Sequence, residues 1–444
     1  MKLRFYLSIL IGRLIYFIMN LFSLNATTFP GKVAYYICPS FLINMRRYFK
    51  KVIFITGTNG KTTTTNLIYQ ILKRTNSKVL ANLEGANLRS GIITAFLKNP
   101  SSYDFGVFEV DEGIFPYVFR ELKPDFIVIT NFFRDQLDRY GEIDKTVNAI
   151  GNVLKDYDKT VLILNADDPF VARFSRLSNK KYFYGINIKL KEEKEEIRES
   201  IYCPFCGQKL QYEYFNYAQM GKYSCSCGFR NPPYDFYITS AKYENNKWIF
   251  EVKGENMSID LSFNYPGIYN LYNALAGFAL AKTLGIQTDI IKEGIENFSF
   301  KLGRWEAYSY KGYNKILILV KNPAGYNQVL DSIIQDSEEK ILLLILNDNI
   351  ADGRDISWIW DVDFEMLCND HHIKKIICSG KRGEELLLRL KYAEFPLEKL
   401  ELINDISKSL KLSIHTPQKV YILPTYTALF YSRKFLKRSI KDGN

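Results

Sequence analysis

The sequence predicts an α/β protein with a P-loop ATPase domain around a parallel central sheet, a four-cysteine zinc-ribbon insertion, and a smaller C-terminal Rossmann-like α/β domain. Three observations predict this fold. Short apolar strands alternate with helical patterns along most of the chain, which indicates parallel sheets. A glycine-rich turn separates the first strand from the helix that follows, as in phosphate-binding loops. Four cysteines lie close together in two pairs, as in zinc ribbons.

The bulk composition is that of a globular protein with anionic partners. A chain of 444 residues with 47% apolar residues can bury two or three cores, which excludes a disordered or fibrous class. The net charge of +11 favours nucleotide phosphates, a membrane surface or nucleic acid as partners. Seven cysteines, four of them crowded into one segment, suit a reducing compartment with one metal site. We therefore expect a cytoplasmic protein.

The first 24 residues are strongly apolar and leave three alternatives open. Basic residues precede the apolar run, as in a signal peptide, but no convincing small-residue cleavage site follows. Arg13 and Asn20 interrupt the run, and a spanning helix would bury the cation at a cost of about 2.5–3.5 kcal/mol. We expect residues 1–45 to form a helical segment that docks on the protein or lies on the inner membrane surface. A true span or signal is the third alternative.

The remaining patterns divide into two domains. Residues 46–305 are expected to form the ATPase domain, with strands near residues 51–55, 105–110, 126–129 and 161–164. An insertion at about residues 199–233 interrupts it, and tyrosine-rich strands at residues 235–263 return to it. Residues 306–444 repeat the alternation as a second α/β domain, with strands near residues 316–320, 341–346, 376–378 and 420–423.

The glycine-rich turn is the run Gly57-Thr58-Asn59-Gly60-Lys61-Thr62-Thr63. Such a turn points backbone N–H groups and the positive end of a helix dipole at phosphate. We expect Lys61 to reach the β- and γ-phosphates of ATP and the Thr62 hydroxyl to ligate Mg2+. Ile55 stands where the general P-loop pattern has a glycine, so only a narrower pattern is met. The alternative is a glycine-rich turn that arose by chance.

That narrower pattern resembles the Mur ligase superfamily, and further segments resemble it in the same order along the chain. The segments are Glu109 in Phe-Glu-Val-Asp-Glu, Thr130-Asn131 followed by Asp135-Gln136-Leu-Asp138, Asn165-Ala-Asp167-Asp168-Pro169, Asn270-Leu-Tyr-Asn273, and Gly303-Arg304-Trp-Glu306. The chain departs from the family at Gln136, where a histidine is usual. The resemblance implies a Mur ligase-type ATPase domain that binds ATP and Mg2+.

The resemblance also implies roles for individual residues. Glu109 matches the family's Mg2+-binding glutamate, and a carboxylate suits Mg2+ because this ion prefers hard oxygen ligands. Asp111 or Glu112 is a candidate to share that role. Asn270 matches the helix start near adenine, and Arg304 matches the arginine that contacts the nucleotide.

The four clustered cysteines have the spacing of a zinc ribbon. Cys203-Pro-Phe-Cys206 and Cys225-Ser-Cys227 are separated by 18 residues, so two knuckles can present four thiolates. The second knuckle is one residue shorter than usual, and Gly228 can relax its turn. Four cysteine ligands leave no position for water, so we expect a structural zinc. The alternative is a pair of buried thiol clusters without metal.

Within the superfamily, the chain resembles the MurT family. Fifty-six residues precede Gly57, fewer than the roughly 100 of a typical domain, so we expect the UDP-binding domain of other Mur ligases to be missing. The four-cysteine insert and the later segment Asp352-Gly-Arg-Asp355-Ile-Ser-Trp358-Ile-Trp360 are typical of the MurT family. Its members are synthetase subunits of lipid II isoglutaminyl synthase and form a heterodimer with a GatD-type glutaminase. They use ATP and ammonia to convert D-glutamate of the lipid II stem peptide into D-isoglutamine.

A glutaminase needs a cysteine nucleophile with a histidine base, and none of the three histidines here is set in such a motif. Ammonia must then come from a partner or from free ammonium. The resemblance implies that Asp355 completes the partner's Cys-His pair, as the third member of a triad does. Asp352 is the competing residue, and both could instead cap the following segment. Trp358 and Trp360 suit an interface anchor or the core equally.

Three other functions remain as alternatives. A Mur-like or folylpolyglutamate-synthetase-like ligase would join an amino acid to a carboxylate and need no glutaminase. A zinc-ribbon nucleic-acid-binding protein would explain the charge and the cysteines, but the basic residues are scattered and form no clear stripe, so we expect no nucleic acid. A regulatory ATP-binding subunit without turnover is disfavoured by the intact Lys61, Thr62 and Glu109.

Overall fold

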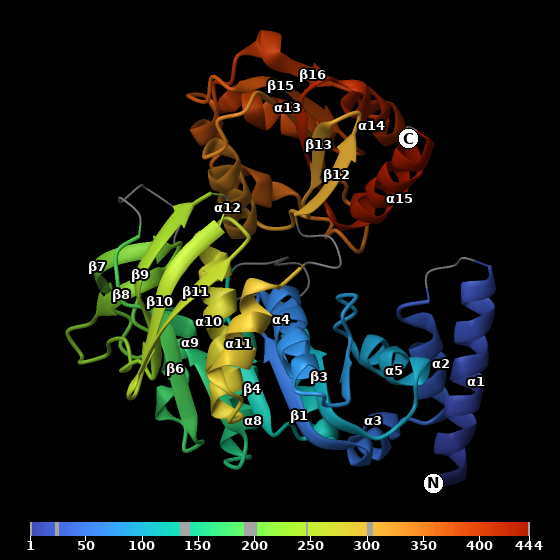
Figure 1. Cartoon of the computed structure of the whole chain (residues 1–444), viewed down its shortest axis with the longest axis vertical. Helices are drawn as coiled ribbons and strands as arrows, with labels where there is room; N and C mark the ends of the chain where they lie inside the picture. Colours follow the sequence, from blue (N-terminus) through green and yellow to red (C-terminus); the bar gives the residue numbers. More distant parts are fainter. Residues whose placement is uncertain are drawn as a thin grey trace. The chain divides into compact units, whose positions relative to one another are not determined.

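The computed structural model describes residues 2–22, 26–133, 143–190, 202–245, 247–299 and 305–442. The chain divides into two compact units, and among the described residues the first ends at Phe298 and the second begins at Ser299. Each unit has its own sheet and helices (Figure 1). The predicted α/β class is therefore confirmed, and the exact domain boundaries stay a prediction.

The sheet of the first unit is parallel over most of its width. Its strand order is β11-β10-β9-β6-β5-β4-β1-β3-β2, and the strands from β9 to β2 run parallel. β10 and β11 extend the edge in antiparallel pairing. The bounds are β1 (Phe49–Thr56), β2 (Val79–Ala81), β3 (Tyr103–Glu109), β4 (Phe126–Ile129), β5 (Val161–Asn165), β6 (Lys181–Ile186), β9 (Phe236–Glu244), β10 (Lys247–Gly254) and β11 (Met257–Phe263).

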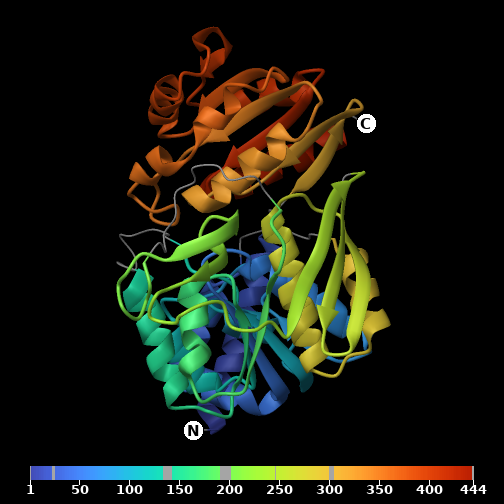
Figure 2. The same ribbon diagram turned by 90° about the vertical axis from the view of Figure 1, so that its left-hand side faces the viewer.

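Helices cover this sheet on both faces. The last five residues of the central strand β1 are therefore all buried, although their side chains alternate in direction. Figure 2 shows the sheet and its helices from the side. The helices are α1 (Lys2–Leu21), α2 (Phe29–Ile37), α3 (Phe41–Met45), α4 (Lys61–Arg74), α5 (Arg89–Lys98), α6 (Phe115–Leu122), α8 (Ile143–Lys155), α9 (Pro169–Ala172), α10 (Ile268–Thr283) and α11 (Thr288–Glu296), with 3-10 turns at Arg46–Tyr48 and Arg173–Arg176.

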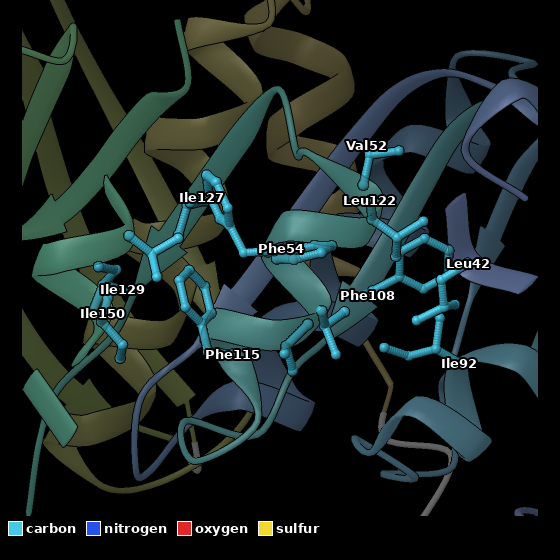
Figure 3. Packing of buried hydrophobic residues seen from close by; sticks show 14 of the residues in the cluster. Leu42, Val52, Phe54, Ile92, Phe108, Phe115, Leu122, Ile127, Ile129 and Ile150 are labelled. Atoms are coloured by element: carbon cyan, nitrogen blue, oxygen red, sulfur yellow. The ribbon is translucent and has the colours of Figure 1, made fainter. Parts of the chain in front are cut away.

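The core of the first unit is rich in aromatic rings. Phe54 of β1 and Phe115 of α6 pack edge to face, with ring centroids 6.1 Å apart. Figure 3 shows them with Phe108, Ile127 and further apolar side chains from strands and helices. Because this core ties β1 to its neighbours, it fixes the strand end from which the glycine-rich loop leaves.

The N-terminal helices belong to the first unit. α1 buries Phe5, whose ring lies 4.9 Å from that of Phe41 on α3. Gly12 lets α1 approach α5 closely, since a Cβ there would come within 2.6 Å of Leu97 Cδ1. One face of α1 is thus docked on the first unit, while the predicted alternatives for the helix as a whole stay predictions. The helix is also long and apolar enough to cross a membrane, although only 17% of its most apolar window is buried.

The insertion forms a small hairpin of its own, β7 (Gln211–Tyr217) and β8 (Met220–Ser224), which pair antiparallel. The four predicted ligand cysteines flank this hairpin. Leu210, Tyr223 and Phe229 form a small core with two of the cysteines and Ala172 of α9. The insertion is therefore packed on the ATPase sheet region through α9.

The second unit is a smaller α/β layer structure. Its strand order is β12-β13-β17-β14-β15-β16, parallel except for β12. All six residues of the central β14 are buried, as expected for a strand covered on both faces. The elements are β12 (Glu306–Tyr310), β13 (Tyr313–Leu317), α12 (Pro323–Ile334), β14 (Lys340–Ile345), β15 (Ile373–Ser379), α13 (Gly383–Tyr392), β16 (Leu400–Leu402), α14 (Ile406–His415), β17 (Lys419–Pro424) and α15 (Tyr426–Asp442), with 3-10 turns at Ser357–Asp361, Phe364–Leu367 and Leu397–Lys399.

Candidate functional site

The glycine-rich loop connects the end of β1 to the first turn of α4. Its glycines are required by the backbone, because Gly57 and Gly60 have φ values of 122° and 85°. A Cβ on Gly57 would lie 2.7 Å from the Asn131 carbonyl oxygen, and one on Gly60 would collide with the Asn273 side chain. The loop is therefore pressed against two other segments and presents the N-terminus of α4, which suits an anion.

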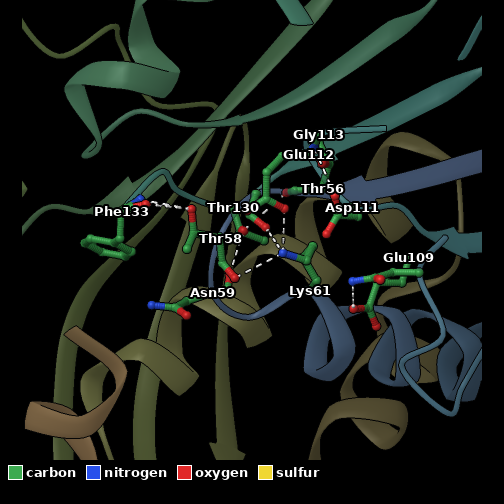
Figure 4. Close-up of polar contacts among 12 residues, drawn as sticks. Thr56, Thr58, Asn59, Lys61, Glu109, Asp111, Glu112, Gly113, Thr130 and Phe133 are labelled. Carbon is green, nitrogen blue, oxygen red and sulfur yellow. Dashed lines mark hydrogen bonds and ion pairs between the residues drawn. The ribbon is translucent and has the colours of Figure 1, made fainter. Parts of the chain in front are cut away.

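The segment Thr130-Asn131 holds the loop in place. The backbone N–H of Asn59 donates to Asn131 Oδ1 at 2.9 Å, and that of Thr58 donates to the Asn131 carbonyl at 2.8 Å. The Asn59 carbonyl accepts from Thr130 Oγ1 at 2.7 Å. Figure 4 shows part of this arrangement. Thr130 and Asn131 thus fix the loop, and we call these two residues the clamp. The predicted residues Asp135, Gln136 and Asp138 lie outside the described residues.

Lys61 lies buried at the start of α4 and is surrounded by acceptors. Its Nζ donates to the carbonyls of Gly57 and Thr58 and pairs with Glu112 Oε2 at 2.8 Å. Burial alone lowers the pKa of Lys61, but the carboxylates of Glu112, Asp111 and Glu109 outweigh it, and the pKa lies above its usual value. Lys61 therefore stays charged where a phosphate would need it.

Glu109, at the end of β3, has a spare oxygen. Asn82 fixes its backbone with two hydrogen bonds of 2.8 Å, and Asn87 donates to Oε1 at 3.3 Å. Its buried Oε2 accepts no hydrogen bond from the residues that the structure describes. A buried carboxylate oxygen without a donor costs free energy unless a cation completes it. The donor set fits Mg2+, which prefers such oxygens.

The other two acidic residues after β3 have different roles. Asp111 Oδ1 accepts from the Gly113 N–H at 3.0 Å and so turns the chain into α6. Glu112 is the ion partner of Lys61. Sequence reasoning left the two as equal candidates for a shared Mg2+ ligand and missed the Lys61 pair. No spacing along the chain signals this pair, because Lys61 and Glu112 belong to segments that the pairing of β1 with β3 brings together.

The segment that begins α10 also reaches the loop. Asn273 Oδ1 accepts from Thr64 Oγ1 at 3.4 Å, and Asn273 Nδ2 donates to Asn270 Oδ1 at 3.4 Å. Asn270 in turn donates to the Pro266 carbonyl at 2.6 Å. The predicted nucleotide residues of the loop, Glu109 and Asn270 are thus brought to one end of the sheet, whereas Arg304 lies outside the described residues.

Asp167 and Asp168 lie behind this site and are fully buried. Burial raises the pKa of Asp167 to about 6 and that of Asp168 to about 7 despite several hydrogen bonds. Asp168 accepts from the Phe132 N–H at 2.8 Å, and Asp167 accepts from Tyr272 on α10 at 2.8 Å. Asp168 thus stabilises the backbone next to the clamp residues, and Asp167 connects its own turn to α10.

The insertion hairpin extends to the glycine-rich loop. Tyr217 Oη lies 3.5 Å from Asn59 Nδ2, and its ring centroid is 5.2 Å from that of Phe133. Gln219, fully buried at the hairpin turn, donates to the Phe132 carbonyl at 2.7 Å. Nothing in the cysteine spacing indicated this contact. It links the four-cysteine insertion to the clamp that holds the loop.

The four cysteines converge as predicted. All four Sγ atoms lie within 4.8 Å of one another, with 3.6 Å between Cys203 and Cys227 and 3.4 Å between Cys206 and Cys225. Four thiolates bound about 2.3 Å from one zinc in a tetrahedron would have their sulfur atoms about 3.8 Å apart. Gly228 has a φ of 88°, so it relaxes the shorter knuckle as expected. The residues fit a zinc ion.

In the second unit the two candidate aspartates differ sharply. Asp352 is buried and accepts from the Thr427 N–H at 2.7 Å, which caps the start of α15. Asp355 is exposed, and hydrogen bonds from Ser357 lower its pKa, so the carboxylate is ionised at neutral pH. Trp358 packs against the core, whereas Trp360 is about half exposed. Asp355 is the one that a partner can reach.

Comparisons with known proteins agree with these observations. The Mur ligase middle domain matches residues 55–281, and the MurT ligase C-terminal domain matches residues 319–429. The lipid II isoglutaminyl synthase (glutamine-hydrolyzing) subunit MurT of Staphylococcus aureus (strain COL) is 38% identical over 421 residues, which covers 94% of each chain. The subunit of the same name from Streptococcus pneumoniae is 35% identical over 98% of each chain.

Solved structures agree on the fold. A pseudomurein peptide ligase type C from Methanothermus fervidus has a TM-score of 0.67 and 25% identity, and the match covers 87% of this chain and 78% of that one. MurF from Acinetobacter baumannii has a TM-score of 0.65 at 17% identity, over 92% of this chain and 80% of that one. The second likeness, at this identity, concerns the fold alone.

Proposed function

Because the chain belongs to the MurT family of Mur ligases, we propose that it is the synthetase subunit of a glutamine-dependent amidotransferase that acts on lipid II in peptidoglycan synthesis. The observation that carries this proposal is the similarity to the two MurT subunits over nearly the whole of each chain. In this assignment residues 46–305 activate the substrate, and residues 306–444 bind a GatD-type glutaminase.

The reaction joins ammonia to a carboxylate at the expense of ATP. An oxygen of the α-carboxylate of D-glutamate attacks the γ-phosphorus of ATP, the bond to the bridging oxygen breaks, and ADP leaves. The nitrogen of ammonia then attacks the carbonyl carbon of the acyl phosphate. Phosphate leaves with the bonding electrons, and the nitrogen loses a proton. The net change replaces a carboxylate oxygen by an amino group, which gives D-isoglutamine.

The loop at the start of α4 is proposed to bind the phosphates of ATP. Its N–H groups and the charged Lys61 stabilise negative charge on the transferred phosphoryl group. Lys61 already has a strong partner in Glu112 at 2.8 Å, so phosphate must replace that carboxylate as its counter-charge. Asn270 is proposed to line the adenine side of the site, because it lies next to Asn273 and so close to the loop.

Glu109 and Thr62 are proposed as the residues that would hold Mg2+. When bound, the ion neutralises phosphate charge and orients the γ-phosphate. Glu109 supplies the buried oxygen without a donor, and Thr62 supplies a hydroxyl at the first turn of α4. Asn82 fixes the backbone of Glu109 with two hydrogen bonds, which supports this carboxylate as a preformed ligand for the ion.

Zinc is proposed to have a structural role in the insertion. Cys203, Cys206, Cys225 and Cys227 would fill all four positions of a tetrahedral site, which leaves none for a reacting water. The metal would fix the ends of the hairpin whose turn contacts the clamp segment. Its loss should therefore affect stability more than chemistry.

The partner glutaminase is proposed to use Asp355 as the third member of its catalytic triad. The supporting facts are the exposure and ionised state of Asp355 and the engagement of Asp352 at the cap of α15. Trp360 lies beside Tyr392, with ring centroids 5.4 Å apart, and both are exposed. Exposed aromatic side chains of this kind are common anchors in protein interfaces.

The test is amidation of lipid II followed by mass spectrometry. The chain is incubated with ATP, Mg2+ and lipid II, with ammonium or glutamine, and with or without a GatD-type glutaminase. We expect a product in which a hydroxyl mass is replaced by an amino mass, formed from glutamine only when the glutaminase is present. A gain of an amino acid residue, with no product from ammonium, would instead support the amino-acid ligase.

The same enzyme is proposed to work in the cytoplasm, at the inner face of the membrane that carries lipid II. The substrate itself requires this location, because its lipid tail stays in the bilayer while ATP is cytoplasmic.

A further inference from the structure

The N-terminal helix α1 has two apolar faces, and the described residues cover only one. Phe5, Ser8 and Gly12 are buried against α2, α3 and α5. On the opposite face, leucine and phenylalanine side chains are exposed by more than half: Leu3 82%, Leu10 68%, Leu14 57%, Phe17 67% and Leu21 70%. Exposed apolar area of this extent marks an interaction surface.

The exposed residues form one continuous stripe. They recur at spacings of three, four and seven residues, which places them on one side of an α-helix. Tyr6, Leu7 and Ile18, also exposed, widen the stripe on both sides. Arg4 and Arg13 are exposed at its two edges, about a quarter-turn from its centre. An apolar stripe edged by cations is the pattern of a helix that lies in a membrane interface.

The charge of the surrounding sequence favours an anionic occupant. The chain contains no Asp or Glu before Glu84, whereas the first 50 residues contain seven Lys and Arg residues. Two helices of this kind placed face to face would bring like charges together, with no carboxylate in α1 to pair with them. An anionic lipid surface supplies the missing counter-charge, so it fits better than a second copy.

The packing of α1 decides between lying on the bilayer and crossing it. A spanning helix would have to leave unit 1, and the close approach of Gly12 to Leu97 and Ala34 would be lost. Phe5 would also leave the aromatic contact with Phe41. If the helix stays docked, its outer stripe can enter the headgroup region while its inner face remains on the protein.

We propose that α1 is a membrane-docking surface, whose outer stripe inserts into the interface of an anionic bilayer while its inner face stays packed on the first unit. This inference goes beyond the proposed reaction and rests on no step of it. It gives the enzyme an anchor of its own on the surface where its proposed substrate lies.

The test is co-sedimentation of the full chain with phospholipid vesicles, without ATP or lipid II. We expect binding to vesicles that contain phosphatidylglycerol, and weaker binding to pure phosphatidylcholine or at high salt, because salt screens the cations. The variant L10E/F17E should lose at least about tenfold in binding, since charges would enter the apolar interface. The variant L397E makes the same change at a leucine that is 59% exposed in the second unit and should bind normally.

A second variant separates charge from apolar insertion. R4Q/R13Q should reduce the preference for anionic vesicles while leaving the weaker binding to neutral vesicles unchanged. Circular dichroism melting of each variant checks that the chain is folded, which is expected because the substituted side chains point outward. Equal vesicle binding by L10E/F17E and the natural chain, or no binding by the natural chain, would overturn the proposal. So would conversion of a dimer into a monomer by L10E/F17E without any vesicle binding, which would assign the stripe to a second copy.

Because no lipid II or ATP is present, failure here would leave the amidation proposal untouched. Failure of amidation would likewise leave the vesicle result standing.

Discussion

The glycine-rich loop and the four-cysteine cluster are the two proposed ion-binding regions of one unit, and they are built in opposite ways. The cluster takes all four of its cysteines from 25 consecutive residues, 203–227, and their Sγ atoms already converge. The loop region draws on segments around residues 57–63, 82–87, 109–112, 130–131 and 270–273. It keeps a buried Glu109 oxygen without a donor. A complete ligand set suits a permanent structural ion, and an incomplete one suits ions that come and go with substrate.

The largest expected effect comes from Lys61→Ala. Loss of the charge that faces the phosphates should lower the amidation rate by roughly 10²–10³-fold. The control is Lys51→Ala, the same change at an exposed lysine of β1, and both rates are measured with ammonium as nitrogen donor.

Lys61→Ala also leaves the buried Glu112 without its cation, which should lower the melting temperature. The double variant Lys61→Ala/Glu112→Gln should recover much of the stability and none of the activity. If activity returned with stability, Lys61 would be a structural residue, and the contrast between the two regions would fail.

Removal of one cysteine from the four-cysteine cluster should have the opposite effect, with stability lowered more than the reaction rate. Cys225→Ser should lose the zinc and lower the melting temperature by about 5 °C or more, equivalent to roughly 2 kcal/mol for a unit of this size. Metal content is measured by plasma mass spectrometry and stability by calorimetry. Cys368→Ser, outside the cluster, should keep its zinc.

Loss of Mg2+ and loss of zinc, each produced with a chelator in the natural protein, should have different effects. We expect loss of Mg2+ to stop amidation reversibly with little change in melting temperature. If loss of zinc left the melting temperature unchanged, the structural assignment of the cluster would be wrong.

The buried aspartates between the two regions should make stability depend on pH. The pKa of Asp168 is about 7 in the folded protein against 3.8 for an ordinary Asp, so the folded state binds more protons between those values. The free energy of unfolding contributed by this group therefore falls as pH rises from about 4 to 7, by about 2–4 kcal/mol. Asp168→Asn should flatten that part of the pH profile, measured by urea unfolding at pH 5.0 and 7.5. The exposed Asp158→Asn should leave it unchanged.

The smallest effect concerns the link between insertion and loop. Gln219→Ala removes the donor to the buried Phe132 carbonyl and should cost about 1–3 kcal/mol of stability. It should also raise the Kd for ATP a few-fold, because Phe132 follows the clamp residues Thr130 and Asn131. The exposed Gln211→Ala, at the start of β7, is the matched control. An unchanged Kd with lowered stability would show that the insertion supports the fold without influencing the loop.

How far sequence reasoning reached follows from how local each feature is. The convergence of the four cysteines and the turn at Gly228 could be predicted because cysteine spacing along the chain sets the knuckle geometry. The parallel strands could be predicted because buried strands are continuously apolar. The clamp of Asn131 on the loop, the Glu112 pair and the reach of Gln219 could not be derived from spacing, since each joins segments brought together by the sheet.

The resemblance favoured Asp355 over Asp352 as the shared residue, which stays a prediction, but spacing alone could not separate the two. Both lie in the same short segment with similar turn residues, and only the contact with Thr427 shows that Asp352 is used as a helix cap. For α1, the apolar composition predicted docking or membrane contact as alternatives, and the structure buries only one of the two faces.

The most direct test of the account compares two nitrogen sources in Asp355→Asn, assembled with the glutaminase. We predict that amidation of lipid II with ammonium keeps its natural rate while amidation with amide-15N glutamine is lost, and that Asp361→Asn, a nearby aspartate, retains both. Equal rates from glutamine in Asp355→Asn and the natural chain would contradict the proposed shared triad. Loss of both rates would place Asp355 in the synthetase reaction itself.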